Sequence, residues 1–292
     1  MIVVAGVDVG SVTAKTVLLD DEQRVLASHV VYQGIVNEEA ARRCFHEALA
    51  MAGLERGQVA VIVATGYGRD LVGFGDLTVT EISCHADGAA FMLPGVRTII
   101  DIGGQDSKVI GLDANGVVLN FRMNDRCAAG TGRFLEVMAG ALRVSLDDIG
   151  PLSLQSEKPA QVSSTCAVFA ESEIVSLMAQ GVQKRDIIAG LHAAICRRIS
   201  GMVRGVGLRD RVAMTGGVAK NEGVLRQLER EMGVSIVVPP NPQIIGALGA
   251  ARFALREAGR LAAVKPEKLV GFAEMTAARD AAGGARCSGC DS

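Results

Sequence analysis

The sequence predicts an α/β protein built from two similar domains that face each other. Hydrophobic residues make up 49% of the 292 residues, but aromatic residues only 3%. The cores must therefore be built from Val, Ile, Leu, Ala and Met, which is typical of parallel sheets flanked by helices. Residues 6–26 align with residues 99–119 as an internal repeat. A third glycine-rich segment, residues 212–224, stands between an apolar strand and a helix-like run.

Each copy of the repeat reads as an apolar strand, an Asp-x-Gly turn, a polar hairpin tip and a second apolar strand. Asp8 aligns with Asp101, and Lys15 aligns with Lys108. Glycine-rich turns let backbone N–H groups approach an anion closely. The aspartates, expected at strand ends, can hold Mg²⁺ through water. Two facing hairpins of this kind predict a polyphosphate clamp, hence nucleotide binding; the alternative is two ordinary hairpins with turn glycines.

Helices are expected at several places after the first repeat copy. Asn37 can cap a helix over residues 38–52, with acidic residues in its first turn. Residues 185–204 carry apolar side chains at near-helical spacing. His192 lies in this second segment, where we expect a packed or half-exposed histidine rather than a catalytic one. The run after the third glycine cluster is expected to end at Gly233.

These patterns predict four segments along the chain. Residues 1–96 are expected to form the first domain and residues 97–241 the second. The sequence "NPQIIGALGAARFALREAG" reads as a loop and a closing helix, within residues 242–264. Residues 265–292 are expected to form a tail, and the Ala- and Gly-rich composition from Thr276 to Ser292 indicates weak order.

Charge and hydropathy exclude some classes of function. Lys and Arg number 30 against 32 Asp and Glu, a net charge of -2, which argues against a nucleic-acid footprint. No uncharged apolar run approaches the roughly 18 residues of a membrane span. The N-terminal "MIVVAGVDVG" lacks the basic region of a signal peptide. We therefore expect a cytoplasmic protein that binds neither nucleic acid nor membranes.

The seven cysteines fall into three groups, at positions 44, 84, 127, 166, 196, 287 and 290. An odd number in a long chain without a signal peptide is typical of reduced thiols. Cys44 and Cys196 occupy apolar positions of helix-like segments and are expected in the core, and a core position is also favoured for Cys84. The tail "CSGC", with Cys287 and Cys290, is weak evidence for a metal or redox site.

Cys127 and Cys166 are different, because each stands where a helix is expected to begin. The segments are "NDRCAAGTGRF" and "SSTCAVFAESEIV". Neither is a CxxC motif, and two thiols cannot complete a four-ligand site within one chain. From spacing alone, two buried cysteines that bind nothing, or half of a zinc site shared between two chains, remain alternatives.

Three motifs, in their order along the chain, resemble those of the fold shared by actin, hexokinase, acetate kinase and the chaperone ATPases. "DVGSVTAKTVLLD" resembles its first phosphate motif, "DIGGQDSKVI" its second and "MTGGVAKNEGV" its adenosine motif. With "ATGYGR", "EISCHADGA", "MNDRCAAGTGRFLEVMA" and "SSTCAVFAESEI", the chain is similar to the activators of 2-hydroxyacyl-CoA dehydratases. The ATPase subunits of benzoyl-CoA reductases share much of this pattern. The resemblance covers about residues 4–258 and leaves the "CSGC" tail unexplained.

The resemblance implies a homodimer with one [4Fe-4S] cluster between its subunits. Cys127 and Cys166 of each chain would be the ligands, and helix N-termini beside them would stabilise the negative charge of the reduced cluster. A ferredoxin or flavodoxin would load the cluster. ATP and Mg²⁺ would bind in the cleft between the domains, and ATP hydrolysis would drive delivery of one low-potential electron to the dehydratase.

The resemblance also implies roles for individual residues. Asp8 and Asp101 would hold Mg²⁺ or its waters, and Gln105 would position the attacking water. The residues expected to contact the nucleotide are Ser11, Val12, Thr13, Ala14, Lys15, Gly103, Gly104, Gln105, Asp106, Gly216, Gly217, Asn221 and Gln243.

Three other functions remain open on the sequence. One is the ATPase subunit of a benzoyl-CoA reductase, a permanent subunit rather than a separate activator. Another is a small-molecule kinase of the same fold, in which the cysteines would be incidental. The last is a nucleotide-sensing module without appreciable ATP turnover.

Overall fold

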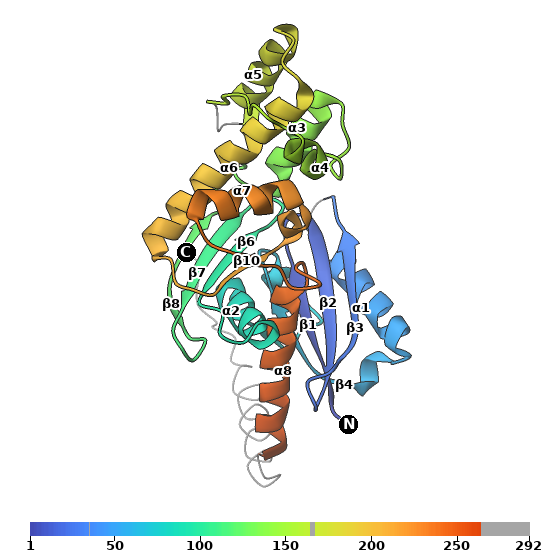
Figure 1. Cartoon of the computed structure of the whole chain (residues 1–292). Coiled ribbons are helices and arrows are strands. Elements are labelled where there is room, and N and C mark those ends of the chain that lie inside the picture. Colours follow the sequence, from blue (N-terminus) through green and yellow to red (C-terminus); the bar gives the residue numbers. More distant parts are fainter. Residues whose placement is uncertain (35, 164–166, 264–292) are drawn as a thin grey trace, which may run out of the picture.

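The computed structural model describes residues 1–34, 36–163 and 167–263. Within this part of the chain, two five-stranded sheets lie beside each other with helices packed on them (Figure 1). The first sheet contains β1 (Val3–Val9), β2 (Thr13–Asp20), β3 (Val25–Tyr32), β4 (Val59–Thr65) and β5 (Leu77–Thr78). The second contains β6 (Thr98–Ile102), β7 (Ser107–Leu112), β8 (Val118–Asn124), β9 (Val212–Thr215) and β10 (Ile236–Val237).

The internal repeat is confirmed, and it extends over the whole of each sheet. The strand orders are β3-β2-β1-β4-β5 and β8-β7-β6-β9-β10, which match strand for strand. Asp8 lies opposite Lys15 in the first hairpin, as Asp101 lies opposite Lys108 in the second. The sheets are mixed rather than parallel, because each begins with two consecutive hairpins and only the later strands join in parallel.

The expected helices are present with nearly the expected ends. They are α1 (Glu38–Ala52), α6 (Lys184–Val206), α7 (Glu222–Met232) and α8 (Ile245–Ala263). Asn37 caps α1, since its side chain accepts a hydrogen bond from the backbone N of Ala40 at 2.8 Å. Gly233 ends α7 in the left-handed conformation that glycine adopts without strain. Short 3₁₀ turns occupy Arg56–Gln58, Arg69–Leu71 and Gly217–Lys220.

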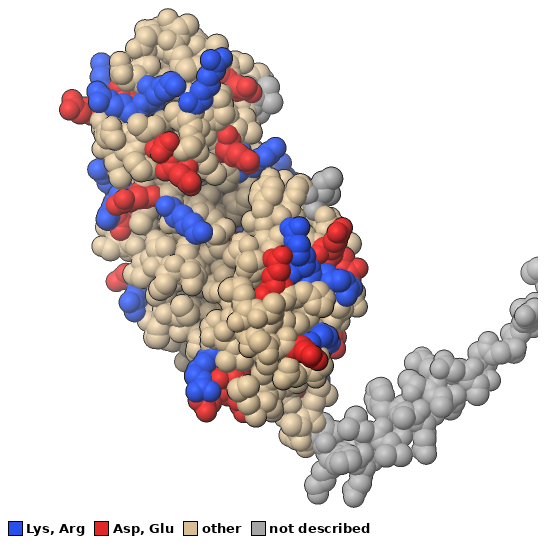
Figure 2. Space-filling view, turned by 90° about the vertical axis from the view of Figure 1, so that its right-hand side faces the viewer, with Lys and Arg blue, Asp and Glu red and all other residues tan. Residues whose placement is uncertain are grey.

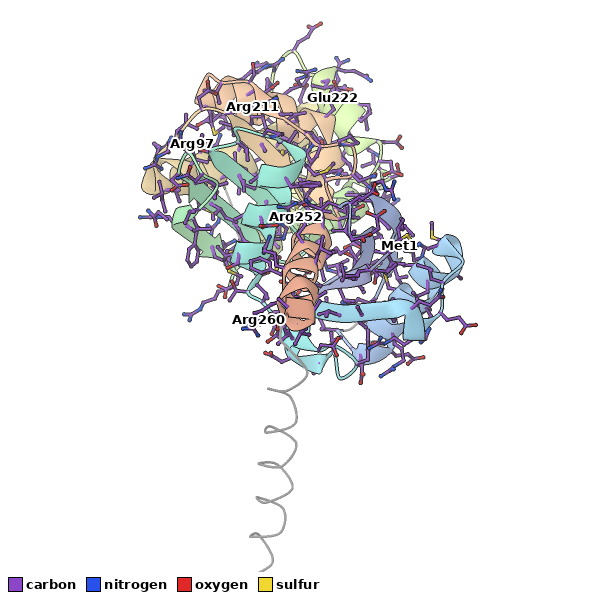
Figure 3. All side chains as sticks on the ribbon, turned by 90° about the horizontal axis from the view of Figure 1, so that it is seen from below. Met1, Arg97, Arg211, Glu222, Arg252 and Arg260 are labelled. Carbon is purple, nitrogen blue, oxygen red and sulfur yellow. The ribbon has the colours of Figure 1, made fainter. Side chains whose placement is uncertain are left out.

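The helices α2 (Glu81–Met92) and α8 form the seam between the two sheets. A Cβ atom on Gly249 would lie 1.8 Å from the carbonyl oxygen of Cys84, so the two helix backbones touch. Asp87 of α2 also receives a hydrogen bond of 2.6 Å from Arg252 of α8. Because α8 packs on β1, β2 and β4 while α2 contacts β7 and β8, this pair connects the two halves. Figure 3 shows α8, marked by Arg252 and Arg260, between the strands of the two sheets.

Three further helices gather at one end of the molecule (Figure 1). They are α3 (Gly132–Leu142), α4 (Ile149–Leu154) and α5 (Ala167–Ala179). Helix α6 runs from this end along the second sheet, where it packs on β7 and β8. Phe134 and Met138 of α3 share a buried cluster with Ile174 of α5. The helices that follow the two cysteine segments therefore pack against each other.

Charged side chains of both signs are distributed over the surface. Figure 2 shows basic and acidic side chains interspersed over one face, without an extended area of one sign. In the part of the chain that the structure describes, no helix combines the length and the apolar character needed to span a bilayer.

Candidate functional site

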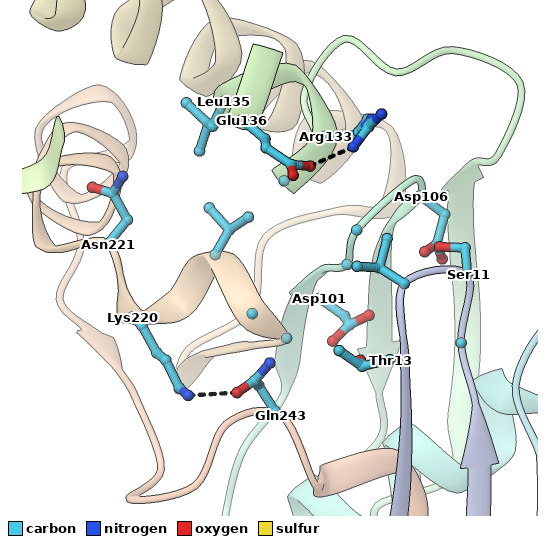
Figure 4. Close-up of a pocket in the computed structure, with 18 of the residues that line it drawn as sticks. Ser11, Thr13, Asp101, Asp106, Arg133, Leu135, Glu136, Lys220, Asn221 and Gln243 are labelled. Carbon is cyan, nitrogen blue, oxygen red and sulfur yellow. Dashed lines mark hydrogen bonds and ion pairs between the residues drawn. The ribbon is translucent and has the colours of Figure 1, made fainter. Parts of the chain in front are cut away.

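A cavity of about 520 Å³ lies between the two sheets, where the tips of both hairpins meet. Most of the residues selected from the sequence line it (Figure 4). They are Asp8, Ser11, Val12, Thr13, Lys15, Asp101, Gly103, Gly104, Asp106, Gly216, Gly217, Asn221 and Gln243. Two selected residues do not line the cavity: Ala14 is buried inside the first sheet, and Gln105 is exposed at the tip of the second hairpin.

The two hairpin turns contact each other at the edge of the cavity. Each is closed by a backbone hydrogen bond, from Gly10 to Thr13 at 3.0 Å and from Gly103 to Asp106 at 2.9 Å. A Cβ atom on Gly104 would lie 2.3 Å from Cγ2 of Val12, so only glycine allows this approach. The turns therefore form two facing walls of the cavity, and glycine-rich turns of this kind suit an anion.

Each hairpin carries a lysine–aspartate pair at the floor of the cavity. Lys15 lies 3.2 Å from Asp8 in the first hairpin. In the second, Lys108 lies 3.4 Å from Asp101, whose other oxygen accepts a hydrogen bond of 2.8 Å from Thr215. Burial by itself would raise the pKa of Asp101, but His85 and Lys108 lower it to about 2. Asp101 is therefore a fixed negative charge at neutral pH.

Three ionisable residues of this floor were not among the selected site residues: Glu81, His85 and Lys108, of which only Lys108 was noted in the sequence, as the counterpart of Lys15. Glu81 lies 3.2 Å from Lys108, and burial raises the pKa of its carboxyl group. His85, one turn further along α2, lies with Nδ1 3.5 Å from Asp101. The signal was available, because Glu81 and His85 are four residues apart in "EISCHADGA" and hence on one helix face.

The far end of the cavity is formed by the third glycine motif. Gly216 has a φ of 85°, and a Cβ atom there would lie 2.3 Å from the carbonyl oxygen of Ile102. Asn221 caps α7, since its Oδ1 accepts a hydrogen bond from Val224 N at 3.1 Å. Lys220 donates a hydrogen bond to Gln243 at this end (Figure 4). Asn221 thus lines the cavity, but its side-chain Oδ1 already accepts the hydrogen bond that caps α7.

His192 lies behind Asn221 and confirms the expectation of a packed histidine. It is 1% exposed, and burial lowers its pKa to about 3. Its Nε2 lies 3.5 Å from Nδ2 of Asn221. The neutral ring therefore accepts from the amide and holds the α7 cap in place.

Helix α3 begins directly on the second hairpin turn. The backbone N of Gly132 donates to the oxygen of Gly103 at 2.9 Å, and that of Arg133 donates to the oxygen of Gly104 at 2.7 Å. Two N–H groups that a helix start usually leaves unpaired are thus satisfied by the turn. Any displacement of the turn must therefore act on the start of α3.

Cys127 lies in the loop between β8 and α3, not in the first turn of the helix. It is half-buried, and its carbonyl oxygen accepts a hydrogen bond of 2.8 Å from Asn124. The expectation of a helix start at this cysteine was wrong by a few residues, because the helix begins only at the contact with Gly103. Cys166, Cys287 and Cys290 lie outside the described residues.

The other described cysteines are core residues. Cys44, Cys84 and Cys196 are buried, and burial raises the pKa of each thiol. Cys127 alone among the described cysteines is partly accessible, which suits a metal ligand better than a buried thiol does. Within the described ranges, no three His, Cys, Asp or Glu side chains form a group that could hold a metal.

Comparisons with known proteins identify relatives of similar length and fold. The (R)-2-hydroxyglutaryl-CoA dehydratase activating ATPase of Acidaminococcus fermentans is 47% identical over 256 residues, which cover 87% of this chain and 98% of that protein. A solved structure of the activator of the 2-hydroxyisocaproyl-CoA dehydratase from Clostridium difficile, with bound ADPNP, has a TM-score of 0.86. It is 42% identical and covers 90% of this chain and 98% of that chain.

More distant similarities define the breadth of the family and of the fold. A benzoyl-CoA reductase subunit of Thauera aromatica is 33% identical over 265 residues, covering 86% of this chain and 92% of that protein. A ROK family glucokinase from Streptomyces griseus, at 16% identity and a TM-score of 0.53, shares the fold alone. The family model described as BadF/BadG/BcrA/BcrD ATPase matches residues 5–254. This chain therefore belongs to the BadF/BadG/BcrA/BcrD ATPase family.

Proposed function

We propose that this protein is an ATP-driven electron-transfer activator of a 2-hydroxyacyl-CoA dehydratase. The observation that carries the proposal is the joint between the second hairpin turn and α3, at Gly103 and Gly104. It connects the cavity to the helix that follows Cys127 through two backbone hydrogen bonds. The activators named among the relatives support the choice of partner.

The cavity suits a nucleotide that lies between the two halves of the molecule. The turns Gly10–Thr13 and Gly103–Asp106 would hold the phosphates, and the end with Gly216 and Gln243 would take the adenosine. Asp8 and Asp101 would orient Mg²⁺ through its waters. Since the described residues form no complete metal site, such an ion would take most of its ligands from phosphate and water.

Hydrolysis needs a group that orients the attacking water. Gln105 remains our proposal for this role, although in this structure it is exposed and would have to turn inward. Glu81 is a second candidate, because it lines the cavity and burial raises the pKa of its carboxyl group. A carboxylate of this kind accepts a proton more readily than Asp101 does.

For the redox function, Cys127 and Cys166 would supply two thiolates, and a second copy of the chain would supply two more. The described part of the chain fits this to the extent that Cys127 is accessible while Cys44, Cys84 and Cys196 are buried. When bound, a [4Fe-4S] cluster would provide one-electron storage at low potential. A cytoplasmic ferredoxin or flavodoxin would be the electron donor.

The alternative is the ATPase subunit of a benzoyl-CoA reductase, which the similarity to the reductase subunit of Thauera aromatica favours. The two functions use the same site and differ in how firmly the chain binds its partner. Isolation of a tagged chain from its native host distinguishes them. An activator is expected to elute as a dimer of this chain, whereas a reductase subunit should retain larger subunits.

The proposed function is tested by purification without oxygen. We expect about four irons and four sulfides per two chains, and an EPR signal after reduction with dithionite. Cys127→Ser should lose the iron, while Cys44→Ser, which alters a buried thiol, should keep it. Iron-free protein with unimpaired ATP turnover would contradict the electron-transfer function and favour a kinase or nucleotide sensor.

A further inference from the structure

Arg133 occupies an unusual place in the cavity wall. Its backbone N is bonded to Gly104 of the second hairpin turn, so its position relative to that turn is fixed. Its side chain lines the cavity. Figure 4 shows Arg133 on the side of Asp106 and Ser11, while Lys220, Asn221 and Gln243 lie on the opposite side. A nucleotide with its base near Gln243 would direct its terminal phosphate toward Arg133.

The two lysines at the floor of the cavity are firmly held by carboxylates. Lys15 is paired with buried Asp8, and Lys108 is enclosed by Glu81, Asp101 and Asp106. Lys220 is exposed and hydrogen-bonded to the neutral amide of Gln243, on the side of the cavity opposite Arg133 (Figure 4). Burial alone would lower the pKa of Lys108, but Asp101, Asp106 and Glu81 raise it. The charges of Lys15 and Lys108 would be costly to remove from their partners.

Arg133, in contrast, has a partner that it can exchange. Its Nη1 lies 2.8 Å from Glu136, one turn further along α3, and the two side chains are 50% and 43% exposed. Ion pairs at such exposure contribute little to stability. A guanidinium matches a phosphate with two parallel hydrogen bonds, and charge-assisted bonds of this kind are the stronger ones.

We infer that Arg133 binds the terminal phosphate of ATP, which displaces Glu136, and that this exchange distinguishes ATP from ADP. The inference rests on the proposed placement of the nucleotide in the cavity. ADP lacks the phosphate that reaches this side, so in the ADP state Arg133 returns to Glu136. Arg133 belongs to the first turn of α3, the helix that follows Cys127. The exchange of its partner therefore also changes the interactions at the start of this helix.

The test compares nucleotide affinities of the full-length chain in the presence of Mg²⁺. Dissociation constants for ADP and for a non-hydrolysable ATP analogue are measured by calorimetry for the wild type and four variants. Arg133→Ala should lose about tenfold in affinity for the analogue, with the ADP affinity nearly unchanged. Glu136→Gln, which removes the competing carboxylate, should shift the ratio the other way, about twofold in favour of the analogue.

The remaining variants are controls. Arg260 makes the same type of pair with Glu257, at 2.7 Å on α8 and outside the cavity, and Arg260→Ala should leave both affinities unchanged. Lys15→Ala should weaken both nucleotides. If Arg133→Ala leaves the ratio of affinities unchanged while Lys15→Ala weakens both, the inference is wrong but the cavity is still the nucleotide site. If Lys15→Ala has no effect either, the placement of the nucleotide is wrong as well.

Discussion

The charged floor of the cavity shows what single residues contribute and what the sequence reveals about them. The repeat alignment already pairs Asp8 with Asp101 and Lys15 with Lys108, and the structure places each lysine beside its aspartate. The sequence places Glu81 and His85 on one helix face, but it does not reveal that Glu81 pairs with Lys108, because the two meet only after α2 has packed across the second sheet. Local sequence reveals the lysine–aspartate pair within each hairpin, whereas the contact of Glu81 with Lys108 depends on tertiary packing.

Removing Lys108 should destabilise the protein in a pH-dependent way. The folded pKa of Asp101 is about 2, below the ordinary value, so this group contributes stability above about pH 4 that is lost as pH falls. The Lys108→Met variant removes the cation shared by three carboxylates, those of Asp101, Asp106 and Glu81. Without this cation the carboxylates take up protons at a higher pH than in the wild type, and protonation removes their buried negative charge. We expect a loss of about 3 kcal/mol near neutral pH and a smaller loss near pH 5.

Urea unfolding of wild type and variant at both pH values measures this difference. Lys158→Met is the matched control, because Lys158 is exposed and does not line the cavity. It should change the free energy of unfolding by less than about 0.5 kcal/mol. An equal loss at both pH values in Lys108→Met would show that packing of the lysine stem, rather than its charge, stabilises the floor.

At the scale of elements, the sequence predicted the two hairpins and the ends of α1, α6, α7 and α8 to within a few residues, because these depend on short-range chemistry. Asn37 caps α1, and Asp20 and Asp113 each accept hydrogen bonds from two backbone N–H groups in equivalent turns. The contact of α2 with α8 was not predicted. It depends on Gly249 meeting a backbone oxygen far away in the chain, which no local pattern reports.

Two glycines of α8 provide a test of that contact within one helix. In Gly249→Ala the new Cβ atom would lie 1.8 Å from the carbonyl oxygen of Cys84, so α2 and α8 must separate. We expect a loss of about 3 kcal/mol in the free energy of unfolding. At Gly259 a Cβ atom would meet nothing within 4 Å, and Gly259→Ala should stabilise the helix by about 0.5–1 kcal/mol.

Chemical denaturation of the two variants gives both values. Because the α2–α8 seam sets the separation of the sheets, Gly249→Ala should also weaken nucleotide binding, which Gly259→Ala should not. If Gly249→Ala is as stable as the wild type, the two helices can move apart at little cost. The seam would then be a hinge rather than a fixed joint.

At the scale of the whole molecule, the sequence predicted which segments meet but not how they are joined. The second hairpin turn and the Cys127 segment are close in the sequence, since only β7 and β8 separate Asp106 from Cys127. The backbone hydrogen bonds from α3 to Gly103 and Gly104 could not be predicted, because a contact between backbone groups does not require particular side chains. Through these hydrogen bonds, the cavity is connected to the Cys127 segment more directly than along the chain from Gly104 through β7 and β8.

This path predicts that nucleotide changes the environment of Cys127. A ligand that shifts the second turn acts on the first turn of α3, and the loop with Cys127 is anchored next to it through Asn124. In the iron-free protein, alkylation of Cys127 is followed by mass spectrometry without nucleotide, with ADP and with a non-hydrolysable ATP analogue. The buried thiols of Cys44, Cys84 and Cys196 are internal controls. We expect the analogue to change the rate at Cys127 several-fold and the rates at the controls to stay low.

The same three conditions apply to the iron-loaded dimer proposed above, for which EPR spectra and the rate of iron chelation replace alkylation. By linkage, a nucleotide that shifts the reduction potential of the site must bind the two redox states with different affinities. Affinity for the ATP analogue should therefore differ between oxidised and reduced protein by the factor that the redox titration gives. The coupling is contradicted if spectra and chelation rates are identical in all three conditions while nucleotide is shown to be bound. The nucleotide site and the metal site would then be independent of each other within one chain. In that case the bonds at Gly103 and Gly104 would serve only to start α3.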